Sequence, residues 1–155
     1  ATKRVRARLR VGTHPFALLH DAQRARLYVL NVQSDDVSVL DIQNLDQPLL
    51  LANVKVGKAP YGAALAQGGT RLYVSNQHAD TVSVIDADSL RVLQTLPGFA
   101  YPEGISAHGS KVYVVNWMDD NVAVLDAATG APLATIATGR NSRGFGAFIG
   151  APASP

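Results

Sequence analysis

The sequence predicts an all-β fold built from tandem copies of one four-stranded antiparallel unit. The first observation is a block that reads LYVLN at 27–31, LYVSN at 72–76 and VYVVN at 112–116. A second block follows each copy, as DVSVLD at 36–41, TVSVID at 81–86 and NVAVLD at 121–126. Both blocks recur at the same intervals, 45 and then 40 residues, which indicates a true repeat rather than chance similarity.

A third marker, built around glycine and proline, precedes each tyrosine block. It reads VGTHPFA at 11–17, VGKAPYG at 56–62 and GFAYPEG at 98–104. A degenerate fourth copy, TGRNSRGFG at 138–146, has Arg143 where proline is expected. Between the markers, β-branched and aromatic runs alternate with Gly, Asp, Asn and Ser turns, which predicts consecutive antiparallel strands, A to D. A four-stranded unit of about 42 residues is typical of a β-propeller blade.

The order of these elements predicts a β-propeller fragment of about three and a half four-stranded blades. Arginines alternate with apolar residues over 4–10, which predicts a lone strand D there. The full prediction is strand D at 4–10, blades at 13–54, 58–97 and 101–136, a closing strand A at 143–149 and a tail at 150–155. Because Tyr28, Tyr73 and Tyr113 hold equivalent positions in strand B, we expect all three rings to be largely buried.

The repeat resembles the YVTN β-propeller family, whose unit reads approximately Tyr-Val-x-Asn, a turn, then Val-Ser-Val-Ile-Asp. The resemblance covers residues 4–149 and implies a ring of seven blades, of which this chain would be the carboxyl-terminal half. It also implies a bacterial protein in the periplasm or outside the cell. The family includes surface-layer proteins, periplasmic binding proteins and propeller subunits of amine dehydrogenases.

Three blades and two extra strands are too few to close a ring, because closed propellers have roughly four to eight blades. We therefore expect an open arc, or a ring completed by another chain. An open arc exposes strand edges and apolar blade faces, both of which promote association. The expected partner is another propeller half or a second copy of the chain.

Composition excludes several classes of function. The chain has no cysteine, which excludes disulfides, thiolate metal sites and a cysteine nucleophile. No stretch approaches the roughly 20 apolar residues that a membrane helix needs. Five of the 14 Lys and Arg residues lie in residues 1–10, so the remainder is mildly acidic and nucleic-acid binding is disfavoured. Its only support is the stripe of Arg4, Arg6, Arg8 and Arg10.

The loops vary between units while the strands repeat, as expected for a binding site carried on a scaffold. Because strand direction alternates, the D–A and B–C loops emerge on one face of the propeller, with the mouth of the central channel. The candidate ligand- or partner-binding residues on this face are His14, Lys58, His78, Tyr101, Glu103, Trp117, Arg140 and Arg143. His20 and His108 fall on the opposite face.

Each candidate also has a structural interpretation. His14 can bind a metal or shuttle a proton near the axis, or be a solvent-facing loop histidine; no companion ligands are visible, so we predict no metal site. Trp117 is a binding anchor or packs against a neighbouring loop. Arg140 and Arg143 can hold a carboxylate or phosphate, or pair with Glu103 or Asp119.

Asp41, Asp86 and Asp126 recur at the end of strand C. An Asp there accepts hydrogen bonds from backbone N–H groups two or three residues further on, which predicts a structural role. No catalytic or nucleotide-binding motif occurs in the sequence. The sequence therefore favours a non-catalytic binding or scaffold propeller that has no cofactor and binds a protein or small-molecule ligand. Two enzymatic alternatives stay open: the propeller part of an amine-dehydrogenase-like periplasmic oxidoreductase, and a metal-dependent lactone hydrolase.

Overall fold

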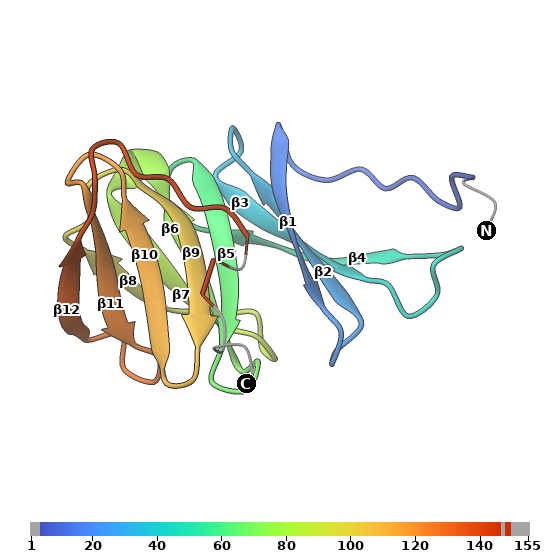
Figure 1. The fold of residues 1–155 in the computed structure, drawn as a ribbon. Helices are drawn as coiled ribbons and strands as arrows, with labels where there is room; N and C mark the ends of the chain where they lie inside the picture. The colour runs from blue at the N-terminus through green and yellow to red at the C-terminus, as the bar shows by residue number, and fades with distance from the viewer. Residues whose placement is uncertain (1–3, 147, 150–155) are drawn as a thin grey trace.

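The strands form three four-stranded antiparallel sheets in a computed structural model that describes residues 4–146 and 148–149 (Figure 1). The first sheet contains β1 (Pro15–Asp21), β2 (Arg26–Asn31), β3 (Asp36–Asp41) and β4 (Leu49–Lys55). The second contains β5 (Pro60–Ala66), β6 (Arg71–Asn76), β7 (Thr81–Asp86) and β8 (Val92–Pro97). The third contains β9 (Pro102–His108), β10 (Lys111–Asn116), β11 (Asn121–Asp126) and β12 (Pro132–Ala137). Among the described residues the only helix is a 3₁₀ turn, η1 (Gln77–Ala79), so the predicted all-β fold is confirmed.

The sheets are arranged as propeller blades in an open arc (Figure 1). Within each blade the strands are hydrogen-bonded in the order in which they follow along the chain. The first strands of the three blades, β1, β5 and β9, lie next to one another, with β5 in contact with both others. These strands therefore form the inner, axial side of the arc, as strand A does in a propeller.

Two apolar cores lie between the blades and hold the arc together. Tyr28 of the first blade packs with Leu72 and Ile85 of the second, and Tyr73 of the second blade packs with Val112 of the third. The rings of Tyr28 and Tyr73 are buried, as predicted, but Tyr113 is only half-buried. Its side of the third blade has no further blade against it among the described residues. Tyr113 is therefore less completely buried than its two counterparts.

The two predicted extra strands are absent from the described part of the chain. Residues 4–10 contain no strand, and neither do residues 143–146 and 148–149, while residue 147 and the tail at 150–155 lie outside the described residues. A strand requires a hydrogen-bonded neighbour. Strand D pairs with strand C of its own blade and strand A with strand B, and the described chain contains neither neighbour for these two segments.

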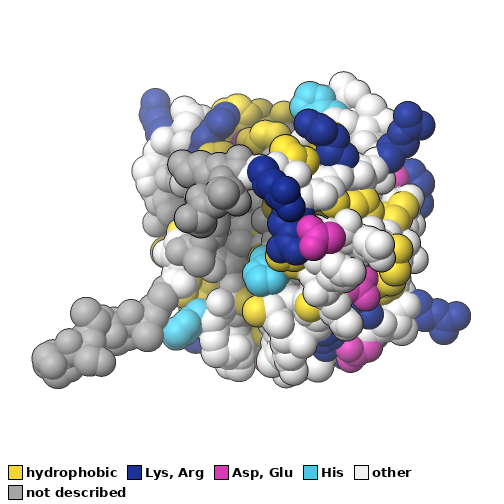
Figure 2. Space-filling view, turned by 90° about the vertical axis from the view of Figure 1, so that its right-hand side faces the viewer, with side chains coloured by type: hydrophobic (Ala, Val, Ile, Leu, Met, Phe, Trp, Pro, Cys, Tyr) yellow, Lys and Arg dark blue, Asp and Glu magenta, His cyan; other side chains and the backbone are white. Residues whose placement is uncertain are grey.

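Apolar side chains are exposed at both ends of the arc. Leu18 in β1 is 66% exposed, and all of β12 is exposed, including Leu133 at 53% and Ile136 at 50%. Figure 2 views the molecule from the side on which the first blade lies, and shows apolar patches interspersed with basic side chains. No helix in the described ranges is long and apolar enough to cross a membrane.

Candidate ligand-binding face

The residue before each inner strand has an unusual backbone conformation. His14, Ala59 and Tyr101 have φ angles of 57°, 55° and 53°, a left-handed region that residues other than glycine rarely adopt. Each is followed by the proline that begins the inner strand of its blade. A left-handed residue reverses the chain sharply, so the repeated marker sets how each D–A loop enters the axial strand.

An aspartate from the preceding blade holds each of these residues from the second blade onward. Asp35 Oδ1 accepts a hydrogen bond from the backbone N–H of Ala59, and Asp80 Oδ1 accepts one from Tyr101, each at 2.9 Å. These aspartates lie in B–C loops and are themselves in the left-handed region, with φ of 54° in both. The bonds join the B–C loop of one blade to the D–A loop of the next, so both kinds of loop lie on one face, as predicted.

The third copy of this bond corrects the alignment of the degenerate marker. Asp120 Oδ1 accepts a hydrogen bond from the backbone N–H of Asn141 at 2.6 Å, and Asn141 has φ of 55°. Asn141 is therefore the counterpart of Tyr101, and Ser142 stands in the proline position. The sequence alignment that put Arg143 there is wrong by one residue. Arg143 corresponds to the residue after the proline, which is Glu103 in the third blade.

The residue after the proline sits at a β-bulge in the first two blades. The pairing of β1 with β2 shifts between Pro15 and Ala17, and that of β5 with β6 shifts between Pro60 and Gly62. The additional residues are Phe16 and Tyr61. A bulge redirects a side chain out of the regular alternation of a strand, and here the two aromatic rings meet, with centroids 4.4 Å apart.

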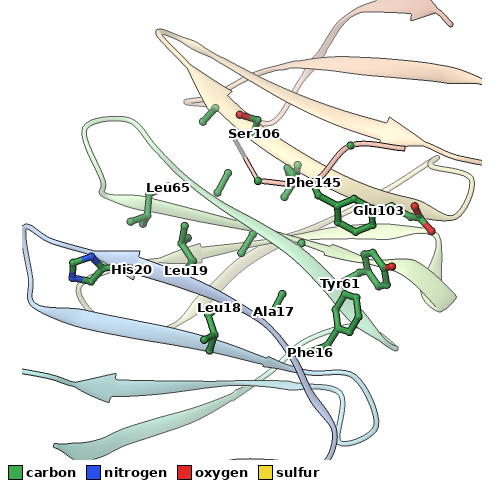
Figure 3. A pocket seen from close by; sticks show the side chains of 18 residues that line it. Phe16, Ala17, Leu18, Leu19, His20, Tyr61, Leu65, Glu103, Ser106 and Phe145 are labelled. Carbon is green, nitrogen blue, oxygen red and sulfur yellow. The ribbon is translucent and has the colours of Figure 1, made fainter. Parts of the chain in front are cut away.

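A groove of about 490 Å³ runs along the axial side of the arc. It is lined by residues of β1, β5 and β9 and by residues 144–146. Figure 3 shows the rings of Phe16, Tyr61 and Phe145 gathered near Glu103 toward one end of the groove, and His20 toward the other. Phe145 lies 5.9 Å from Tyr61 between ring centroids. Burial, and then the negative charge of Glu103, raise the pKa of the Tyr61 phenol.

Glu103 is a buried acidic side chain at the mouth of this groove, with only 1% of its surface exposed. Gln77 Nε2 donates a hydrogen bond of 2.9 Å to Oε1 of the carboxylate. The other oxygen, Oε2, receives no hydrogen bond from any described residue. Its nearest cation is Arg143, whose Nε lies 3.6 Å away, beyond the usual distance of a hydrogen bond.

Aromatic side chains extend from the arginine across the face. Arg143 Cζ lies 4.4 Å from the centroid of the Trp117 ring, which is a cation–π contact. The Trp117 and Tyr101 rings are 5.1 Å apart between centroids, and Tyr101 Oη lies 3.0 Å from His78 Nε2. The cluster of His78, Tyr101, Trp117, Arg143 and Glu103 thus contains five of the eight candidate residues. We call it the mouth cluster.

The other three candidates lie outside the mouth cluster. His14, Lys58 and Arg140 are all exposed. The backbone carbonyls of His14 and Lys58 accept hydrogen bonds from the N–H groups of Val32 and His78, at 3.0 and 3.2 Å. Of the two arginines considered for pairing with Glu103, Arg143 forms the pair, whereas Arg140 makes no ion pair within the described ranges. On the opposite face, His20 and His108 are exposed.

Sequence reasoning missed three residues of this region: Phe16, Tyr61 and Gln77. The first two had a usable signal, because both stand directly after the proline of the marker, the position that Glu103 occupies in the third blade. Gln77 had none, since its contact with Glu103 joins two different blades. No three His, Asp or Glu side chains of residues 4–146 and 148–149 gather closely enough to hold a metal ion.

Comparison of the sequence with protein-family models and with curated proteins finds no match. Solved β-propeller structures are similar in fold. Hydrazine synthase of Kuenenia stuttgartiensis matches 85% of this chain with a TM-score of 0.77 and 23% identity. U3-55K matches 83% with a TM-score of 0.73 and 12% identity, and Citrobacter koseri AztD matches 80% with a TM-score of 0.65 and 15% identity.

These similarities establish that the fold is part of a β-propeller. The chain spans well under half of those structures, covering 38% of the hydrazine synthase chain, 41% of U3-55K and 35% of AztD.

Proposed function

We propose that this chain is a non-catalytic binding propeller of the YVTN type, which recognises a protein partner through the face that carries the mouth cluster. The observation that carries the proposal is the gathering of an indole, a phenol, a guanidinium and a buried carboxylate at the mouth of the axial groove. Trp, Tyr and Arg are the residues that most often dominate the energy of a protein interface. The resemblance to the YVTN repeat supports a location in the periplasm or outside the cell.

The supporting geometry is rigid rather than adaptable. Tyr101 is held by its backbone bond to Asp80, and Glu103 belongs to β9 and is buried. Side chains fixed by a scaffold lose little conformational entropy when a partner binds. The cluster is therefore better suited to recognition of a defined group than the exposed loops at His14 or Lys58.

A peptide library displayed on phage and selected on the 155-residue chain tests this proposal. Enriched peptides are expected to bind Trp117→Ala more weakly by roughly 1 kcal/mol or more, because an interface aromatic is lost. His20→Ala and His108→Ala, on the opposite face, are matched controls that should leave the affinity unchanged. Peptides that depend on His20 or His108, or on neither face, would show that the proposed face is wrong.

A further inference from the structure

We propose that the mouth cluster is a binding site for an arginine side chain of a protein partner, and that Arg143 occupies it as an internal substitute in the free chain. This inference rests on the proposed function and specifies the ligand group of the same face. Its parts are a buried carboxylate with one oxygen left over, an aromatic wall beside it, and a guanidinium already lying between them.

The carboxylate supplies the requirement for a cation. Burying a charged group is costly unless it is paired and hydrogen-bonded. Glu103 is 1% exposed, and only Oε1 receives a hydrogen bond from a described residue, from Gln77. Oε2 faces the guanidinium of Arg143 at 3.6 Å, without a hydrogen bond between them. A cation with better geometry can therefore improve on the present pair.

The aromatic wall favours a guanidinium over an ammonium. A guanidinium is planar, stacks on aromatic rings and can present two N–H groups to a carboxylate, whereas an ammonium is a compact and strongly hydrated charge. The Arg143 guanidinium already lies over the Trp117 ring, 4.4 Å from its centroid, and the Tyr101 ring lies 5.1 Å from that of Trp117 between centroids. The carboxylate and the aromatic face that together recognise a guanidinium are therefore both present at this site.

Arg143 is a replaceable occupant because its own segment is not part of a sheet. It follows the last strand, β12, and no strand includes any described residue after Ala137. Its side chain is 47% exposed, while the carboxylate beneath it is buried. An arginine from a partner can therefore displace it without breaking a strand, and the free chain keeps Glu103 paired until the partner arrives.

The assignment also excludes the anion-binding interpretation of Arg143. A carboxylate or phosphate held there would lie next to Glu103 and be repelled by its charge. The guanidinium is instead directed at Glu103 and Trp117. The site as built selects a cation.

The test uses N-acetyl-arginine N-methylamide as the probe, with the uncharged citrulline and the lysine analogues as matched ligands. Trp117 is the only tryptophan of the chain, so intrinsic fluorescence reports directly on the site. The arginine probe is expected to bind Arg143→Ala at least about tenfold more tightly than the unmodified chain, because the internal competitor is gone. The citrulline analogue should not bind, and the lysine analogue should bind at least about fivefold more weakly than the arginine probe.

The double variant Arg143→Ala with Glu103→Gln should not bind the arginine probe, because glutamine has the same shape as Glu103 but lacks its negative charge. Arg140→Ala, three residues away and outside the mouth cluster, should behave as the unmodified chain. If Arg143→Ala does not fold by circular dichroism, Arg143→Gln keeps the length of the side chain without its charge and takes its place. Equal binding of the probe to the vacated site and the unmodified chain would overturn the inference. Binding of the arginine probe that persists when Glu103→Gln is added would also overturn the inference. So would a lysine analogue that binds as tightly as the arginine probe.

The two proposals fail in distinguishable ways. If the phage-selected peptides require Trp117 but the Arg143→Ala variant does not bind the arginine probe, the partner-binding face is supported and the arginine site is overturned. If the Arg143→Ala variant binds the arginine probe but the selected peptides bind Trp117→Ala as well as the unmodified chain, the arginine site is supported and the partner-binding face is overturned.

Discussion

The carboxylate of Asp80 and the backbone N–H of Tyr101 are joined by a hydrogen bond of 2.9 Å that crosses from one blade to the next. Both residues have left-handed backbones, with φ of 54° and 53°. Asp tolerates this conformation better than most residues, and its short side chain reaches a nearby N–H. One residue type therefore satisfies the loop conformation and the contact between blades together.

Replacing Asp80 with Ala is expected to reduce the free energy of unfolding by about 1–2 kcal/mol, because a charge-assisted bond is lost and alanine is strained at positive φ. Asp80→Asn keeps an acceptor and the tolerance for that conformation, so its loss should be smaller. Urea denaturation measures both. The control is Asp119→Ala, because Asp119 is an exposed residue of the equivalent loop in the third blade. Its free energy of unfolding should stay within about 0.5 kcal/mol of that of the unmodified chain. Equal losses for Asp80→Ala and Asp119→Ala would contradict the assigned role.

The approach of Gly144 to β9 yields a second prediction. A Cβ atom added at Gly104 would overlap the backbone carbonyl of Gly144. Gly104→Ala should therefore push the segment that carries Arg143 away from Glu103, at a cost of about 1–3 kcal/mol typical of overpacking. Trp117 fluorescence should change with it, since the guanidinium over the indole moves. Gly139→Ala is the control, because no atom lies within 4 Å of its added Cβ. An unaltered Trp117 spectrum in Gly104→Ala would refute the prediction.

The repeat predicted the blades because strand pairing within a blade is local. Each strand of the described sheets pairs with its sequence neighbours, so the spacing of the tyrosine and aspartate blocks contains all the information needed. The burial of Tyr113 could not be predicted in this way, because it depends on what packs against the third blade and not on its own strand. The strands predicted at 4–10 and at 143–149 do not form at residues 4–10, 143–146 and 148–149 for the same physical reason.

The mouth cluster was predicted as a set of residues on one face, but not as a set of contacts. Alternating strand direction predicts His78, Tyr101 and Trp117 on one face, and in the structure their side chains contact one another there. The pairing of Arg143 with Glu103 was one of the alternatives considered. The geometry of that pair depends on how the degenerate marker at 138–146 aligns with the other copies. Because this marker lacks the proline, its alignment follows only from the hydrogen bond between Asp120 and Asn141.

Acid should destabilise the chain through the turns that follow strand C. The backbone N–H of Ser89 and then its hydroxyl lower the pKa of Asp86, and the same two groups of Thr129 lower the pKa of Asp126. These carboxylates therefore contribute stability above the unfolded pKa of about 3.9, and the contribution is lost as pH falls through the lowered folded values.

The double variant Asp86→Asn with Asp126→Asn should accordingly show a weaker decrease of the urea midpoint between pH 5 and pH 2, to be compared with the unmodified chain. Asp119→Asn, whose carboxylate lies in a different loop, is the matched control and should keep the original slope. A double variant whose midpoint falls as steeply as that of the unmodified chain would show that these turns do not govern the acid response.

The two buried tyrosines of the repeat should respond differently to loss of their hydroxyl groups. Tyr73 Oη donates a hydrogen bond of 3.0 Å to the backbone carbonyl of Ala127 in the third blade. The corresponding hydroxyl of Tyr28 is buried without a hydrogen-bond partner among the described residues, and the carbonyl of Ala87, the counterpart of Ala127, accepts a hydrogen bond from Arg26. Tyr73→Phe leaves a carbonyl without its donor and should cost about 1 kcal/mol, whereas Tyr28→Phe removes a buried polar atom and should be neutral or stabilising. Urea denaturation of the two variants side by side decides the matter, since both make the same chemical change at equivalent positions. Equal changes in the two variants would show that the hydrogen bond from Tyr73 to Ala127 adds no stability beyond that of the unpartnered Tyr28 hydroxyl.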